Sequence, residues 1–321
     1  MHVQNNLIVS LLVLTGFAGG RLVAAGQPFI PFIPPSGSAA LAATEELPAM
    51  NELHLLKTSY PDVRFTAAYD PSEGDWCLSV TSYGKTTKLY RAGGRYVTAA
   101  QLPEKEKFQL VLYPYERIMQ DPSGYSAEEI EHIQSYSAGR SRADRTEAST
   151  ALFSAIYDAS THAAMESHLK TISFLGRQTT VHERIIQPLM RVEARIKRLS
   201  LTDPRVAAFC DSLLSADSYA WRTVRDTDSR SFHSYGIALD VLPKGWGNKI
   251  VYWKYEQEKN GNEWIRTALS ERWMPPAPVI KAFEDEGFIW GGRWVIWDNM
   301  HFEYHPELLN AGYNSSAVGA Y

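Results

Sequence analysis

Two short stretches in the last third of the chain constrain its fold more than any other feature. The first runs from Ser231 to Asp240 and reads Ser-Phe-His-Ser-Tyr-Gly-Ile-Ala-Leu-Asp. The second runs from Trp297 to Tyr304 and reads Trp-Asp-Asn-Met-His-Phe-Glu-Tyr. Together they hold two histidines and two aspartates. That set is enough for three protein ligands to a zinc ion and a general base, with the fourth metal position left for water.

The spacing of the first stretch predicts a reversal of the backbone. On a continuous helix, His233 and Asp240 would stand roughly 10 Å apart along the axis. Ligands with bonds of about 2 Å to one ion cannot be that distant. The turn is expected at Tyr235-Gly236, because glycine adopts the backbone angles that a sharp reversal needs. Residues 237–241 then form a buried strand that carries Asp240.

The second stretch has a period of two. Met300, Phe302 and Tyr304 alternate with His301 and Glu303. This alternation is typical of a strand with one apolar and one polar face. His301 is therefore expected to point into the site, with Asp298 on the loop just before the strand.

The two stretches resemble the zinc peptidases of family M15, which include D-alanyl-D-alanine carboxypeptidases and the L-alanyl-D-glutamate endopeptidases of phage endolysins and cell-wall hydrolases. The motif that carries the resemblance is Ser231-x-His233-x-x-Gly236-x-Ala238-x-Asp240, followed by Asp298-x-x-His301-Phe302. Similarity also extends through Tyr219–Arg222, Arg230 and Val279–Trp294, so it covers about residues 200 to 310.

The resemblance implies a role for each of four residues. His233, Asp240 and His301 are the expected ligands of one zinc ion, and Asp298 is the expected catalytic base. The D-alanyl-D-alanine dipeptidase and carboxypeptidase branches typically place a glutamate before the final histidine. Asp298 in that position is more similar to the endopeptidase branch.

Two arginines are candidates for binding the substrate or the oxyanion. A guanidinium suits either task, because its planar fork donates several charge-assisted hydrogen bonds. Arg222 is the first candidate and Arg230 the second. For Arg230, a salt bridge that orders the loop at Ser231 is an equal alternative. Ser231 is expected to orient a ligand or the loop, because no base is evident that would make it a nucleophile.

Three further residues are predicted to lie next to the site. Glu303 shares the polar side of the His301 strand, so it is a candidate to hold a ligand histidine from outside. Tyr235 lies beside the expected turn, and Trp290 belongs to a tryptophan-rich segment that would wall the cleft. Burial in the core is the alternative for Trp290 and its neighbours Trp294 and Trp297.

The fold that the resemblance implies is α+β, with a small antiparallel sheet that carries the zinc site and flanking helices, as in hedgehog and D-Ala-D-Ala peptidases. The predicted organisation has four parts. They are a signal peptide (1–25), a proline-rich linker (26–50), a β-rich region (51–120), and a helical lead-in followed by the peptidase domain (121–321).

The N-terminus predicts export. An apolar run from Leu7 to Phe17 precedes glycines and a small-residue cleavage site at 23–25, although residues 1–6 contain no Lys or Arg. A short uncleaved membrane anchor is the alternative, but the run is short for a transmembrane helix. We therefore expect a periplasmic or cell-envelope protein with no stable membrane span once the signal is cleaved.

The middle of the chain changes its pattern near Ser126. Before it, hairpin strands are predicted at 76–83, 86–90, 95–98 and 108–113. After it, a capping box at Ser126–Glu129 begins a series of helical patterns, which continue at 148–164 and 181–199. The β-rich region is either a wall-binding or gating module, or an extension that packs on the catalytic domain.

Composition excludes some classes of partner. The net charge of −4 offers no basic surface for nucleic acid. The 45% of hydrophobic residues can build a full core. The two cysteines, Cys77 and Cys210, either form one disulfide or remain free thiols.

The leading functional hypothesis is an exported zinc peptidase that cuts peptidoglycan stem peptides, as a D,D- or L,D-carboxypeptidase or an L-Ala-D-Glu endopeptidase. A catalytically inactive, zinc-containing wall-binding or structural module is the alternative. A third hypothesis makes the β-rich region the working unit and the zinc purely structural. Structural zinc sites normally have four protein ligands, and only three are evident here.

Overall fold

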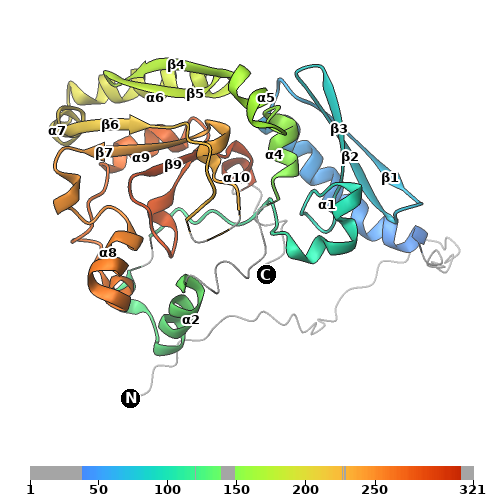
Figure 1. Ribbon diagram of the computed structural model, residues 1–321, viewed down its shortest axis with the longest axis horizontal. Coiled ribbons are helices and arrows are strands. Elements are labelled where there is room, and N and C mark those ends of the chain that lie inside the picture. Colours follow the sequence, from blue (N-terminus) through green and yellow to red (C-terminus); the bar gives the residue numbers. More distant parts are fainter. Residues whose placement is uncertain (1–37, 120, 139–148, 226, 228, 312–321) are drawn as a thin grey trace, which may run out of the picture.

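The computed structural model of the chain describes residues 38–119, 121–138, 149–225, 227 and 229–311 (Figure 1). Over these residues, three antiparallel sheets are surrounded by helices, which confirms the α+β class. The predicted signal peptide and the first part of the predicted linker lie outside the described residues. None of the helices that these described residues form is both long and apolar enough to cross a membrane.

The strands of the three sheets follow in chain order. They are Arg64–Asp70 (β1), Asp75–Ser82 (β2), Lys85–Tyr90 (β3), Leu169–Phe174 (β4), Arg177–His182 (β5), Leu213–Asp217 (β6), Ala238–Pro243 (β7), Phe288–Trp290 (β8) and His301–Tyr304 (β9). The first sheet has the order β1-β2-β3, the second is the hairpin β4-β5, and the third has the order β6-β7-β9-β8.

The α-helices of the described residues are Ser38–Ser59 (α1), Ala127–Ser137 (α2), Ala151–Ile156 (α4), His162–Ser167 (α5), Ile186–Ser200 (α6), Pro204–Ser212 (α7), Trp253–Asn260 (α8), Ala277–Glu284 (α9) and Pro306–Ala311 (α10). Short 3-10 helices lie at Ala99–Lys107 (η1), Pro122–Gly124 (η2), Glu183–Ile185 (η3), Phe232–Tyr235 (η4), Trp246–Asn248 (η5), Gly261–Arg266 (η6) and Gly291–Arg293 (η7).

The four-stranded sheet forms from the two C-terminal motif stretches. β7 and β9 are its central strands, and they confirm the strands predicted at 237–241 and at the alternating segment 300–304. In their antiparallel pairing, Asp240 lies directly opposite His301. Residues directly opposite on adjacent strands have Cβ atoms about 5 Å apart, so the register itself brings these two side chains together.

The N-terminal sheet, β1–β3, packs against the rest of the protein and shares its hydrophobic core. One continuous hydrophobic core runs from Leu56 of α1 and Val80 of β2 through Phe153 of α4 to Phe302 of β9. Figure 1 shows α4 between the β1–β3 sheet and the four-stranded sheet. This continuity favours the packing extension over an independent module.

Two helix predictions are confirmed in detail. α2 begins with the predicted capping box, in which the Ser126 side chain accepts from the Glu129 backbone N–H and the Glu129 side chain accepts from the Ser126 backbone N–H. α6 buries Leu189, Val192 and Ile196 and turns its basic side chains outward, as a 3.6-residue period requires.

Other boundaries were wrong. The predicted linker ends at Ser38 instead of residue 50, because α1 begins there. The helical pattern expected from residue 181 begins only at Ile186, because 169–182 forms the β4-β5 hairpin. Its two-residue turn has positive φ at both Leu175 and Gly176, the geometry of the tightest hairpins.

The strands predicted at 95–98 and 108–113 do not form. The chain reverses through Ala92, Gly93 and Gly94, which all have positive φ. After this reversal only Val97 returns to pair with Tyr90, as a single bridge. The later segment 108–113 joins none of the three sheets; its Val111 N–H donates instead to the Gly94 carbonyl at 3.0 Å.

The two cysteines do not form a disulfide. Cys77 lies on β2 and Cys210 on α7, and each is a partly buried free thiol. The structure thus selects the second of the two alternatives that the sequence left open.

Candidate metal centre

The first ligand candidate, His233, is held on the short helix η4. Ser231 caps this helix by accepting a hydrogen bond from the His233 backbone N–H at 3.3 Å. Gly236 ends the helix in the left-handed conformation, with φ of 62°. The predicted turn is therefore confirmed. A Cβ atom at Gly236 would lie 2.8 Å from the His182 backbone nitrogen, so the site has no room for a side chain.

The three candidate ligands converge. His233 Nε2 lies 3.2 Å from His301 Nδ1 and 3.3 Å from Asp240 Oδ2, and His301 Nδ1 lies 2.8 Å from Asp240 Oδ1. For bonds of about 2.0–2.1 Å in a tetrahedral site, neighbouring ligand atoms stand roughly 3.3 Å apart. The donor set and its spacing therefore fit a zinc ion.

The outer nitrogens of both histidines are already occupied. His233 Nδ1 lies 2.5 Å from the carbonyl oxygen of Ser218, which can only accept, so Nδ1 carries the proton. His301 Nε2 lies 2.8 Å from Glu303 Oε1, so the proton of that ring sits on Nε2. Both inner nitrogens then present lone pairs to a metal, the arrangement that orients histidine ligands in metalloproteins.

The charges at the site favour a cation. Burial alone would raise the pKa of Asp240, but the neighbouring His233 and His301 rings outweigh it and hold the pKa well below its usual range. Burial would likewise lower the pKa of His301, but Glu303 and Asp240 raise it well above its ordinary value. The carboxylates of Asp240 and Glu303 therefore stabilise positive charge at the site between them.

Asp298 lies just before β9, on the loop where the sequence predicted it. Burial raises the pKa of its carboxyl group to about 8, the charge of Asp240 adds to this effect, and His301 only partly opposes it. Its Oδ1 is buried and has no hydrogen-bond partner. A buried acceptor without a partner is costly, and a water molecule at the site would satisfy it.

The two arginine candidates differ in their surroundings. Arg222 is anchored through its backbone, because its N–H donates to Ser234 Oγ at 2.8 Å and its carbonyl accepts from the same hydroxyl at 2.6 Å. Its side chain is exposed, with one long contact of 3.5 Å to the Thr223 carbonyl. The head group is thus available for a ligand, next to the turn that carries His233.

Arg230 is tied into the protein. It donates to the carbonyls of Ala159 and Ser234 at 2.6 and 3.1 Å, and its guanidinium lies over the rings of Trp221 and Tyr235. This geometry corresponds to the loop-ordering alternative, with carbonyls in place of the expected salt-bridge partner.

Tyr235 and Trp290 lie in the core rather than in the cleft. Tyr235 is 1% exposed, and its hydroxyl lies 3.4 Å from Ser154 Oγ. Trp290 is equally buried and donates from Nε1 to the Asn299 carbonyl at 2.9 Å. Trp294 is the tryptophan beside a ligand, because its ring centroid lies 5.6 Å from that of His301.

The structure adds Glu307, which the sequence interpretation missed, and places His305, which follows the predicted strand, next to Glu303. Behind Glu303 lie His305 and Glu307, which are both buried. Burial would lower the pKa of His305, but the Glu307 and Glu303 carboxylates outweigh it and raise the pKa to about 9. Burial would raise the pKa of Glu303, but His301 and His305 lower it to about 2. The signal was present as a period of two: His301, Glu303, His305 and Glu307.

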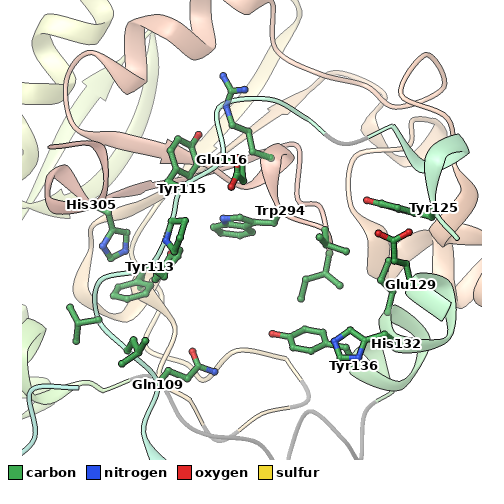
Figure 2. A pocket seen from close by; sticks show the side chains of 18 of the residues that line it. Gln109, Tyr113, Tyr115, Glu116, Tyr125, Glu129, His132, Tyr136, Trp294 and His305 are labelled. Atoms are coloured by element: carbon green, nitrogen blue, oxygen red, sulfur yellow. The ribbon is translucent and has the colours of Figure 1, made fainter. Parts of the chain in front are cut away.

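A cavity of about 1530 Å³ lies between α2 and the segment 109–116, and its lining includes none of the three candidate ligands and not Asp298 (Figure 2). Trp294, which contacts His301, forms part of its wall together with Tyr113 and Tyr115, and residues of α2 such as His132 and Tyr136 lie across from them.

Comparison with known proteins agrees with this geometry. Residues 225–304 match the M15 peptidase family model described as D-alanyl-D-alanine carboxypeptidase. The resemblance to family M15 is thereby confirmed, and the matched segment contains His233, Asp240, Asp298 and His301. Residues 52–112 match a family described as a domain of unknown function (DUF8518). No curated protein and no solved structure matches the chain.

Proposed function

Because residues 225–304 belong to peptidase family M15, we propose that the chain is an exported zinc peptidase that hydrolyses amide bonds in peptidoglycan stem peptides. The observation that carries the proposal is the triangle of His233 Nε2, Asp240 Oδ and His301 Nδ1, with edges of 2.8 to 3.3 Å. Within the described part of the chain, three protein ligands meet there, which is typical of catalytic rather than structural zinc sites.

The residues present would hold zinc and leave one position open. A zinc ion held by these three ligands would lower the pKa of a water molecule and polarise the scissile carbonyl. Asp298 would accept a proton from the attacking water and later return it to the leaving amine. In the metal-free protein, burial raises the pKa of this carboxyl group to about 8; a bound cation would lower it, so that Asp298 would be ionised and able to accept the proton.

Arg222 is the proposed contact for negative charge on the substrate. Its backbone is fixed to the His233 turn through Ser234, whereas its side chain reaches into solvent. A guanidinium in this position would bind a terminal carboxylate or the developing oxyanion through charge-assisted hydrogen bonds. Arg230 and Ser231 would act indirectly, by holding the loop that presents His233.

The substrate class is inferred from the family and from the predicted export. The family model that matches residues 225–304 is described as D-alanyl-D-alanine carboxypeptidase, and a signal peptide would deliver the enzyme to the cell envelope, where peptidoglycan lies. The masses of the products decide between removal of a terminal D-alanine and cleavage between L-alanine and D-glutamate.

The test compares wild-type protein with Asp298→Asn in zinc content and in cleavage of purified muropeptides, with products identified by mass spectrometry. We expect one zinc per chain in both proteins. Cleavage by the variant should fall about 100- to 10,000-fold, the usual contribution of a general base. Asp217→Asn is the matched control, because Asp217 pairs with Asp240 across β6 and β7 but is exposed.

Two outcomes would contradict the proposal. Zinc binding without cleavage by the wild type would instead favour the inactive wall-binding module. A protein that binds no zinc would refute the metal centre itself.

A further inference from the structure

A buried row of side chains connects the candidate metal centre to the N-terminal region. It starts at the ligand His301 and continues through Glu303, His305 and Glu307 to Tyr60, which follows the end of α1. Tyr60 lies within the 52–112 segment, whereas Glu303 lies within the peptidase match. Two segments that match different families therefore meet in one row.

The two glutamates in the row each use both of their carboxylate oxygens. Glu303 has one oxygen 2.8 Å from His301 Nε2 and the other 3.4 Å from His305 Nε2. His305 Nδ1 lies 2.7 Å from Glu307 Oε1, and the Tyr60 hydroxyl donates to Glu307 Oε2 at 2.6 Å. Neither glutamate can rotate without losing one of its two contacts.

The row is largely buried, although His305 borders the cavity of Figure 2. Tyr60 is 1% exposed, His305 2% and Glu307 0%. The rings of Phe153 and Phe232 meet the His305 imidazole edge to face, with centroids 5.2 and 4.4 Å away. Buried polar contacts of this kind are strong when complete and costly when one partner is lost. A substitution at one end of the row should therefore displace the side chains at the other end.

We propose that Tyr60, Glu307 and His305 are positioning residues that fix Glu303, and through it the orientation of the ligand His301. The N-terminal region would then complete the metal centre of the peptidase, in addition to extending its core. The inference rests on the proposed metal site, and it goes beyond the family motif, because Tyr60 lies 247 residues before Glu307 in the chain.

The weakest link is the contact between His305 and Glu303. At 3.4 Å it is an ion-pair distance rather than a well-aligned hydrogen bond, and His305 Nε2 has no other partner. If the position of His305 does not affect Glu303, then Glu303 alone would orient His301, and the contact between Glu307 and Tyr60 would only hold α1 against α10. The experiment is designed to separate these two cases.

The test measures zinc affinity by competition with a chromophoric chelator in the full-length variants Tyr60→Phe, Glu307→Gln and Glu303→Gln. Direct partners of ligand histidines typically contribute 10- to 100-fold in affinity, which is the loss expected for Glu303→Gln. For Tyr60→Phe and Glu307→Gln we expect a smaller loss, of about 3- to 10-fold, because they act through intervening groups.

Two controls separate positioning from general stability. Ser59→Ala removes a neighbouring contact between α1 and α10, in which Asn310 Nδ2 donates to Ser59 Oγ at 3.0 Å, but leaves the row intact. Tyr96→Phe removes another buried tyrosine hydroxyl, whose carboxylate partner Glu52 lies away from the row. Both controls should keep wild-type zinc affinity, even where urea unfolding of the metal-free proteins shows a loss of stability.

The outcomes distinguish this inference from the proposed function. Wild-type zinc affinity in both Tyr60→Phe and Glu307→Gln, with a loss only in Glu303→Gln, would overturn the inference and leave the peptidase intact. Equal losses in Ser59→Ala and Tyr60→Phe would also overturn it, because they would report docking of α1 alone. Absence of zinc binding in the wild type would refute the metal centre instead.

Discussion

Replacing Gly236 by alanine should damage the turn on which the metal centre depends. Gly236 has φ of 62°, and it reverses the chain between His233 and Asp240. An L-residue in the left-handed region costs about 1–2 kcal/mol. The new methyl group would also lie 2.8 Å from the His182 backbone nitrogen and 2.9 Å from Leu169 Cδ2.

The steric part of this cost has no easy relief. Leu169 can change rotamer, but the His182 N–H donates to the Gly236 carbonyl at 2.9 Å, so that backbone cannot retreat without losing a hydrogen bond. Overpacking a tight site typically costs about 1–3 kcal/mol. Together the two effects predict that Gly236→Ala lowers the free energy of unfolding by about 2–5 kcal/mol.

Gly245→Ala is the matched control. Gly245 has nearly the same backbone conformation, with φ of 67°, but nothing lies within 4 Å of a Cβ atom built on it. It should therefore lose only about 1–2 kcal/mol, the conformational part. Urea unfolding of the metal-free proteins gives both values, and chelator competition gives the zinc affinity, which should fall only in Gly236→Ala. Equal destabilisation of the two variants would refute the reasoning.

Two further predictions concern acid stability and substrate binding. Burial lowers the pKa of His182 from 6.5 to about 3, so the unfolded chain gains a proton first and stability falls as pH drops from 6.5 toward 3. Between pH 7 and 5, the free energy of unfolding should therefore fall by about 2 kcal/mol less in His182→Gln than in wild type, as measured by urea unfolding. His54→Gln is the control, and the same pH dependence of unfolding in both variants would contradict the prediction. Arg222→Gln should lower kcat/KM on muropeptides about 10- to 100-fold while zinc affinity and stability stay within about 0.5 kcal/mol of wild type, because its head group is exposed. Unchanged kinetics would remove Arg222 from the site.

Much of the candidate site could be predicted from local sequence. The residues His233 and Asp240 stand seven apart with a glycine between them, and covalent geometry alone requires a turn there if both bind one ion. The period of two from Met300 to Tyr304 likewise follows from strand geometry. These inferences succeeded because spacing, glycine and alternation act within a few residues.

Predictions failed where the outcome depended on partners far away in the chain. The strand expected at 108–113 has a suitable composition, but in the fold the segment joins none of the three sheets and is held instead by a contact with the turn at Gly94. The linker expected up to residue 50 contains part of α1, which is stabilised by packing against α10 and the first sheet. Composition cannot report such contacts.

The sequence by itself thus determined which atoms are available to hold a metal ion, because ligand chemistry and short-range spacing are written in adjacent residues. Only the tertiary structure decided how those atoms are fixed. The β7-β9 register sets Asp240 opposite His301, burial raises the pKa of Asp298 to about 8, and packing of α1 on α10 brings Tyr60 to Glu307. Each of these results depends on sheet pairing and solvent exclusion between distant segments, which no local pattern encodes.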